Sequence, residues 1–165
     1  MTEMTGGTHA TQGGNGLDLD WIVANFAERV PEVIEAIVVS ADGLLIARSP
    51  GLDRDTADQF SAIASGMLSL GRGAARTFDG GTLNDIIVQL DKGYLFVTRV
   101  SDASGLAVVA SRQADAGLVA HEMGLVAERL GGVLTPALIA QLRSGIGVGS
   151  RGHEPSEPAP GGAAG

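Results

Sequence analysis

The amino-acid sequence predicts an α+β domain in which one five-stranded antiparallel sheet carries helices on both of its faces. The first observation is the order of the apolar patterns, which reads helix, two strands, long helix, three strands, helix. The second is that short turn sequences join neighbouring strand-like runs, which is typical of hairpins and meanders. This order excludes a doubly wound α/β fold, which needs βαβ units. The long middle helix packs most simply on one face of a single sheet.

Length and composition set the limits of this domain. The chain has 165 residues, no cysteine and a formal net charge of -8. The lack of cysteine excludes a disulfide scaffold, a zinc–thiolate site and a cysteine nucleophile. The acidic balance argues against a nucleic-acid partner, whose phosphates require a basic surface. With no signal sequence and no apolar run of membrane-spanning length, we expect a cytoplasmic protein that does not insert into a membrane.

The two ends of the chain differ in composition from its middle. Residues 1–16 are polar and glycine-containing, and we expect them to be disordered. Residues 144–165 are rich in Gly, Pro, Ser and Ala, which predicts a flexible tail. The folded domain is therefore predicted over residues 17–143.

Local signals place the elements of this domain. A first helix is expected near residues 18–30, where acidic residues suit its N-terminus and Pro31 ends it. The Asp-Gly pair within Ala41–Gly43 joins two β-branched runs, which predicts a hairpin. Asp53 is a suitable N-cap for a long helix that runs to Phe78. The five strands are expected at Val33–Ser40, Leu44–Ser49, Thr82–Leu90, Tyr94–Val100 and Leu106–Ser111, and two further helices begin near Asp115 and Pro136, the last ending at Leu142.

The long middle helix is the most informative element. It has no charged residue from Gln59 to Gly71, although a helix lying on a sheet normally has a charged outer face. A helical wheel predicts that one face packs on the sheet, namely Phe60, Ile63, Ala64, Met67, Gly71, Ala74 and Phe78. The opposite face carries small, uncharged residues, with two arginines flanking its C-terminal end: Ala62, Ser65, Gly66, Ser69 and Gly73, then Arg72 and Arg76.

The small-residue face and the third strand together suggest self-association. Small residues at this spacing let a second backbone approach closely, so we predict that a second copy of the helix crosses here about a two-fold axis. A mildly polar face exposed to solvent is the alternative. If the third strand lies at an edge, Ile86, Ile87 and Val88 offer it for pairing with another chain, unless Asp85 and Lys92 protect that edge.

No motif for catalysis emerges from the sequence. Gly66–Gly73 half-matches a phosphate-binding P-loop, but Arg72 stands where lysine belongs and no strand precedes it. His121 is the one histidine in the predicted domain and has no partner at catalytic or metal-ligand spacing. The four aspartates between residues 42 and 58 suit a tight turn and a helix N-terminus. We therefore predict a domain that binds partners, with no catalytic, cofactor-binding or metal-binding residues.

Five stretches cover nearly the whole predicted domain, namely residues 17–33, 36–47 (AIVVSADGLLIA), 58–76 (DQFSAIASGMLSLGRGAAR), 92–111 and 117–138. In order and spacing they resemble the Roadblock/dynein light-chain family, in particular its actinobacterial members. The resemblance implies a profilin-like, Roadblock-type fold over residues 17–143. It also implies a homodimer in which the long helices lie side by side and the third strands join into a continuous sheet.

The same resemblance implies a function. Family members regulate Ras-like GTPases, and similar actinobacterial proteins are typically encoded with a sensor histidine kinase and a small GTPase. The expected role is a non-catalytic homodimeric regulator or scaffold that binds a small Ras-like GTPase in bacterial signalling, with Arg72 and Arg76 as candidate partner contacts. The alternative is an adaptor that docks a sensor histidine kinase complex without acting on the GTPase cycle. An enzyme or small-molecule sensor would need a pocket with convergent polar groups, of which the sequence shows no sign.

Overall fold

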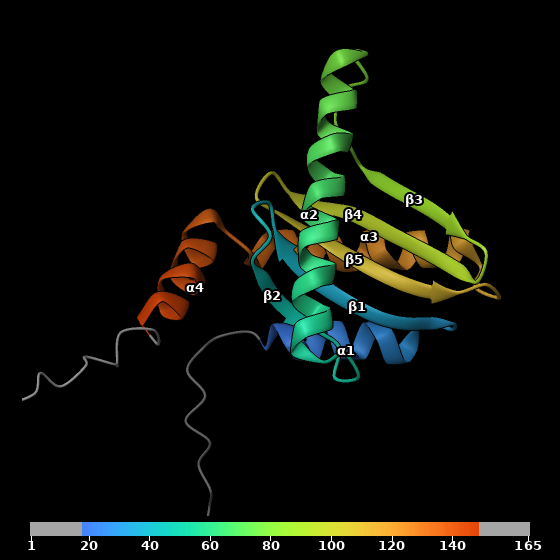
Figure 1. Ribbon diagram of the computed structural model, residues 1–165, viewed down its shortest axis with the longest axis horizontal. Helices are drawn as coiled ribbons and strands as arrows, with labels where there is room; N and C mark the ends of the chain where they lie inside the picture. Colours follow the sequence, from blue (N-terminus) through green and yellow to red (C-terminus); the bar gives the residue numbers. More distant parts are fainter. Residues whose placement is uncertain (1–17, 149–165) are drawn as a thin grey trace, which may run out of the picture.

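The computed structural model describes residues 18–148. Over that range the chain forms helices and strands in the order shown in Figure 1. Their bounds are α1 Leu19–Arg29, β1 Val33–Ser40, β2 Leu45–Arg48, α2 Arg54–Thr77, β3 Asp85–Leu90, β4 Gly93–Ser101, β5 Ser104–Ser111, α3 Ala116–Val133 and α4 Pro136–Val148. The segment predicted to be disordered, residues 1–16, and most of the predicted tail lie outside the described residues.

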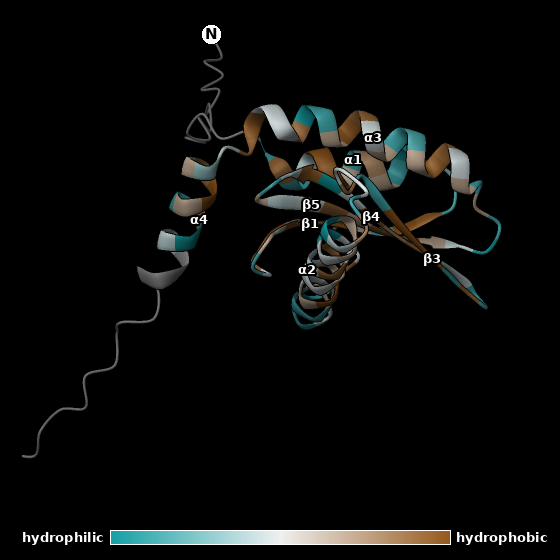
Figure 2. Cartoon of the chain, turned by 90° about the horizontal axis from the view of Figure 1, so that it is seen from above, coloured by the Kyte–Doolittle hydropathy of each residue, from teal (hydrophilic) through white to brown (hydrophobic). Residues whose placement is uncertain are grey.

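The strands form one sheet in the order β2-β1-β5-β4-β3, and every neighbouring pair is antiparallel. Helices α1 and α3 cover one face of this sheet and α2 crosses the other, which gives three layers (Figure 2). The predicted fold class, the element order and the placement of helices on both faces are thereby confirmed. Because β1, β5 and β4 lie inside the sheet, β2 and β3 are left as its two edges.

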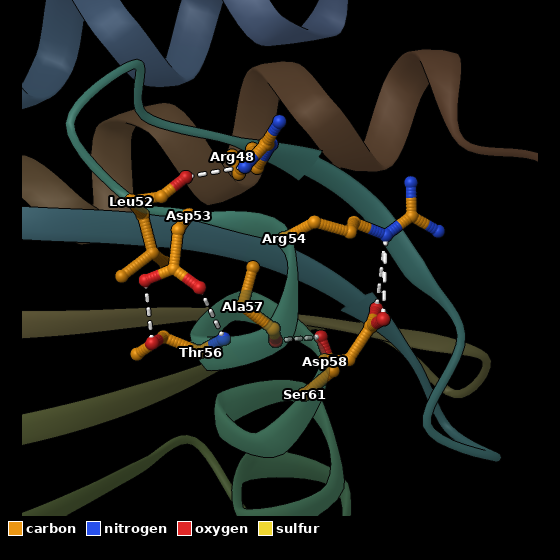
Figure 3. A network of polar contacts seen from close by, with 8 residues as sticks. All are labelled: Arg48, Leu52, Asp53, Arg54, Thr56, Ala57, Asp58 and Ser61. Carbon is orange, nitrogen blue, oxygen red and sulfur yellow. Dashed lines mark hydrogen bonds and ion pairs between the residues drawn. The ribbon is translucent and has the colours of Figure 1, made fainter.

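Each of the first three helices begins after an aspartate that caps it. The cap carboxylates accept backbone N–H bonds three residues on: Asp18 from Trp21 (3.1 Å), Asp53 from Thr56 (3.0 Å) and Asp115 from Leu118 (3.0 Å). These bonds satisfy N–H groups that the start of a helix leaves without a partner. Figure 3 shows the predicted cap at Asp53, whose second oxygen also accepts from the Thr56 hydroxyl at 2.6 Å. The position at which α2 starts is therefore fixed locally.

Two apolar cores lie on the two faces of the sheet. The larger one packs α1 and α3 against the strands, with Phe96 and Met123 among its fully enclosed side chains. The smaller one packs α2 against the sheet, where Leu68 and Val97 have no exposed surface. One face is thus closed by two helices, and the other by a single helix whose outer side is not covered by any other element of residues 18–148.

The largest corrections to the predicted bounds concern two elements. Strand β3 begins at Asp85 rather than Thr82, because the residues before it form the connection from α2. Helix α4 continues past the predicted end at Leu142 to Val148. Each of the two glycines in this stretch, Gly145 and Gly147, lowers helix propensity by about 1 kcal/mol without ending the helix. The Ser144 hydroxyl donates to the Ala140 carbonyl at 3.0 Å just before them.

No single helix in residues 18–148 is long and apolar enough to cross a bilayer. Ala116–Val133 and Pro136–Gly145 meet the length and composition requirement as a pair, but the chain bends by 79° between them.

Candidate functional site

Helix α2 packs on the sheet through a different stripe from the one predicted. Its buried side chains are Ala57, Phe60, Ser61, Ala64 and Leu68. The predictions for Phe60 and Ala64 are confirmed, whereas Ile63 is 53% exposed and Phe78 is 81% exposed. Ile63 lies about 120° around the helix from the buried stripe, and Phe78 follows the C-terminal turns, which project beyond the strands (Figure 1). These two side chains therefore belong to the surface.

The outer face of α2 carries an uncharged surface, defined here by Ala62, Ile63, Gly66, Ser69, Leu70 and Gly73. Leu70 is 77% exposed and lies two helical turns from Ile63 on the same side of the helix. Gly66 lies between them, and a Cβ atom built on it would meet nothing within 4 Å among the described residues. The predicted small-residue face is therefore flanked by two large apolar side chains. Contiguous exposed apolar surface of this kind marks an interaction site.

Two members of the predicted small-residue face are less open than expected. Ser65 and Gly73 are half-buried, whereas Ala62, Gly66 and Ser69 are exposed. The Ser65 hydroxyl faces the β1–β2 turn, where it lies 3.2 Å from the position that a Cβ on Gly43 would take. The exposed strip therefore runs along the helix on the Gly66 side, away from that turn.

Strand β3 is the second part of the candidate interface because, in the part of the chain that the structure describes, one of its sides has no neighbouring strand. The Arg99 N–H donates to the Asn84 carbonyl at 2.9 Å, which fixes the alternation of the ladder with β4. By that alternation, Asp85, Ile87 and Gln89 direct their N–H and C=O groups to the free edge. Ile87 is also 52% exposed.

The side chains of β3 divide between the two faces of the sheet. Ile86 packs in the α2 core, where its Cδ1 atom lies 3.1 Å from the position a Cβ on Gly71 would take. Val88 points to the same face, and Ile87 points to the other. The expected guard Asp85 accepts a hydrogen bond from the Thr98 hydroxyl at 2.8 Å. Its carboxylate is thus held on the neighbouring strand, and the edge itself remains open.

The two arginines predicted as partner contacts lie close to a third arginine. Arg72 is half-buried, and its Nη2 atom donates to the Ser101 carbonyl at 3.4 Å; Arg76 is exposed in the last turn of α2. Together with Arg99 of β4 they line a cavity of about 200 Å³. Arg99 was not among the predicted site residues, because only the pairing of the strands brings β4 beside the end of α2.

A second cavity, of about 340 Å³, lies between α1 and α3 on the opposite face. Trp21, Ile22 and Val126 contribute apolar surface to it, and Arg29 and Arg129 stand at its rim. Arg29 pairs with Glu122 of α3 at 3.1 Å and so links the two helices. One feature of the sequence could have indicated this groove. Trp21 is a large apolar residue that falls outside the apolar spacing of α1.

Three of the four aspartates considered for metal binding have separate partners. A hydrogen bond from the Ser40 hydroxyl, together with the charge of Arg143, lowers the pKa of Asp42. Hydrogen bonds from the Thr56 hydroxyl and N–H lower the pKa of Asp53, and Asp58 pairs with Arg54 at 3.2 Å (Figure 3). Within residues 18–148, no three His, Asp or Glu side chains come together in a way that could hold a metal ion.

Comparison with known proteins bears directly on this chain. The model of the Roadblock/LC7 domain matches residues 19–110. A Roadblock/LC7 domain from Streptomyces avermitilis is 41% identical; the match covers 69% of this chain and 95% of that one, with a TM-score of 0.66. No curated protein sequence matches.

Two more distant structures share the fold. MglB of Myxococcus xanthus is 16% identical with a TM-score of 0.62, over 69% of this chain and 92% of that one. Profilin IB of Acanthamoeba castellanii is 18% identical with a TM-score of 0.51, over 68% of this chain and 96% of that one. From its sequence match, its sheet order and the placement of its helices, the chain belongs to the Roadblock/LC7 domain family.

Proposed function

We propose that the protein is a non-catalytic homodimeric regulator of a small Ras-like GTPase. Membership of the Roadblock/LC7 family supports a regulatory role. The observation that carries the proposal is the uncharged outer face of α2 beside an open β3 edge. Both features are surfaces suited to another polypeptide, and the fold of the single chain requires neither.

In the proposed dimer the α2 helices of two copies cross about a two-fold axis. Ile63 and Leu70 of one copy pack beside Gly66 of the other, where the absence of a Cβ allows close approach. Burying one such side chain contributes about 1.5–3 kcal/mol. The interface comprises Ala62, Ser65, Gly66, Ser69 and Gly73 together with Ile86, Ile87 and Val88, whose strand pairs with its counterpart to extend the sheet.

The GTPase docks across the paired helices, and Arg72 and Arg76 are its proposed contacts. Both guanidinium groups lie at the C-terminal end of α2, beside the interface. Arginine is suited to such a contact because its planar fork recognises carboxylate and phosphate groups through two hydrogen bonds. These residues are thus expected to face acidic groups on the partner.

Binding assays test this proposal with the small Ras-like GTPases of the organism that encodes the chain, each loaded with GDP or a non-hydrolysable GTP analogue. We expect one of them to bind the dimer, and Arg72→Glu with Arg76→Glu to weaken that binding at least tenfold. Arg54→Glu is the matched control, because Arg54 lies at the other end of the same helix, paired with Asp58.

The outcomes are distinct. Lack of binding in both nucleotide states would contradict the proposal. Recovery of a sensor histidine kinase in a pull-down, with unchanged GTP hydrolysis, would instead support the adaptor role.

A further inference from the structure

Three guanidinium groups meet in one cavity at the end of α2. Arg72 and Arg76 come from α2 and Arg99 from β4, and the cavity is completed by the loop Gly81–Leu83 and by Asp102. The chain has 11 Lys and Arg residues against 19 Asp and Glu, with a formal net charge of -8. Three cationic side chains around one cavity of about 200 Å³ therefore stand against the overall charge of the protein.

The positive charge of this cavity is poorly compensated by its own walls. Asp102 is its one carboxylate, paired with Arg99 at 3.3 Å, and the Asp102 side chain is fully exposed. An exposed pair of this kind is strongly screened by water. Within residues 18–148, neither Arg72 nor Arg76 forms an ion pair. The cavity thus has a net charge of about +2, counting one unit for each ionised side chain at neutral pH.

Arg99 also has a donor for which residues 18–148 provide no acceptor. Its Nε atom is buried and has no hydrogen-bond partner. Leaving such a donor unsatisfied costs about 1–3 kcal/mol, and more for a charged group. An oxyanion held between the arginines would supply acceptors to the guanidinium groups that line the cavity, and Thr82, also in the lining, carries a neutral hydroxyl donor.

We propose that this cavity binds a phosphate group. Arginine forks match the oxygens of a phosphate through paired hydrogen bonds, and two or more net positive charges suit a dianion. The cavity is smaller than the roughly 300–1,000 Å³ of pockets that enclose a drug-sized ligand. It therefore holds the phosphate itself, and the remainder of a phosphorylated small molecule stays in solvent. The cavity is built within one chain, so the inference does not depend on the proposed GTPase.

Nuclear magnetic resonance of the full chain alone tests this inference through the arginine Nε–Hε signals. Inorganic phosphate and glycerol 3-phosphate are titrated separately at constant ionic strength, with sodium chloride and acetate as reference anions. We expect saturable shifts of the Arg72 and Arg99 signals with both phosphates. Tighter binding of glycerol 3-phosphate would identify a phosphorylated small molecule as the source of the group, and equal binding would identify free phosphate.

Variants distinguish a specific phosphate site from a general attraction of anions to positive charge. We expect Arg99→Gln to weaken phosphate binding at least tenfold and Arg54→Gln to leave it unchanged. If Arg99→Gln alters the circular dichroism spectrum of the fold, the double variant Arg72→Gln with Arg76→Gln decides, because both residues lie in the C-terminal turns of α2, outside its buried stripe. Shifts of equal size with chloride, or equal loss in the Arg54→Gln control, would overturn the proposal.

Discussion

The two edges of the sheet differ in whether their outward backbone groups are hydrogen-bonded within the chain. At the β2 edge, the outward N–H of Arg48 donates to the Asp20 carboxylate of α1 at 2.9 Å, and the Arg48 guanidinium binds the Leu52 carbonyl. At the β3 edge, no comparable bond is made to the outward groups of Asp85, Ile87 and Gln89 within the described residues. A chain that closes one edge and leaves the other open beside an apolar helix face presents that second edge for pairing.

Two proline substitutions in β3 have the largest expected effect. They test which backbone N–H groups of this strand make no hydrogen bond to β4. Val88 bonds to β4, so Val88→Pro removes a ladder bond and should lower the free energy of unfolding of the monomer by about 2 kcal/mol. The N–H of Ile87 faces outward, where proline is tolerated, so Ile87→Pro should keep the monomer stable and weaken the dimer. Urea unfolding and sedimentation velocity measure the two effects. Equal loss of monomer stability in both variants would show that the edge is assigned wrongly.

Removing the carboxylate that binds the β2 edge should have a smaller effect on the free energy of unfolding. Asp20→Ala takes away the acceptor of the Arg48 N–H, and we expect the free energy of unfolding to fall by about 1 kcal/mol. Because β2 has only four residues, the opened edge should not create a new association. A change in the oligomeric state of this variant would contradict the distinction between the two edges.

Gly66→Ala separates the stability of the single chain from that of the dimer. A Cβ on Gly66 meets nothing within 4 Å in the single chain, so alanine should raise the free energy of unfolding of the monomer by up to about 1 kcal/mol. The same methyl group should obstruct the helix crossing and weaken the dimer. Thermal melts at low and high protein concentration distinguish the two effects, and a dimer stabilised by this substitution would argue against close packing at Gly66.

Acid should slightly reduce the stability that Asp42 contributes at the β1–β2 turn. The Ser40 hydroxyl and the charge of Arg143 depress the pKa of Asp42 in the folded state below its ordinary value of 3.8. The stabilising contribution of Asp42 is therefore complete above pH 3.8 and is lost as the pH falls through the lower, folded-state pKa. Urea unfolding between pH 6 and pH 2 should show a shallower acid limb for Asp42→Asn than for the wild type. Identical limbs would show that Asp42 contributes nothing.

Most of the fold could be predicted because its signals are local. Asp53 as a cap, Pro31 as a stop and the Asp-Gly turn each act on the few residues beside them. The orientation of α2 could not be predicted in the same way, since the rotation of the helix about its own axis, set by tertiary packing, decides whether Ile63 or Leu68 is buried. The cluster containing Arg99 depends on strand pairing and was invisible for the same reason. The outer face of α2 was found through its missing charges, although its two large apolar residues were misplaced or overlooked.

The central claim is that the outer face of α2 joins two copies of the chain. Light scattering of the double variant Ile63→Lys with Leu70→Lys tests it most directly. The matched control is Leu118→Lys with Leu125→Lys on α3, a pair at the same spacing that is 41% and 43% exposed. The account predicts a folded monomer for the α2 variant and a dimer for the wild type and the control. A dimer that survives the α2 substitutions, or a monomeric wild type, would contradict it.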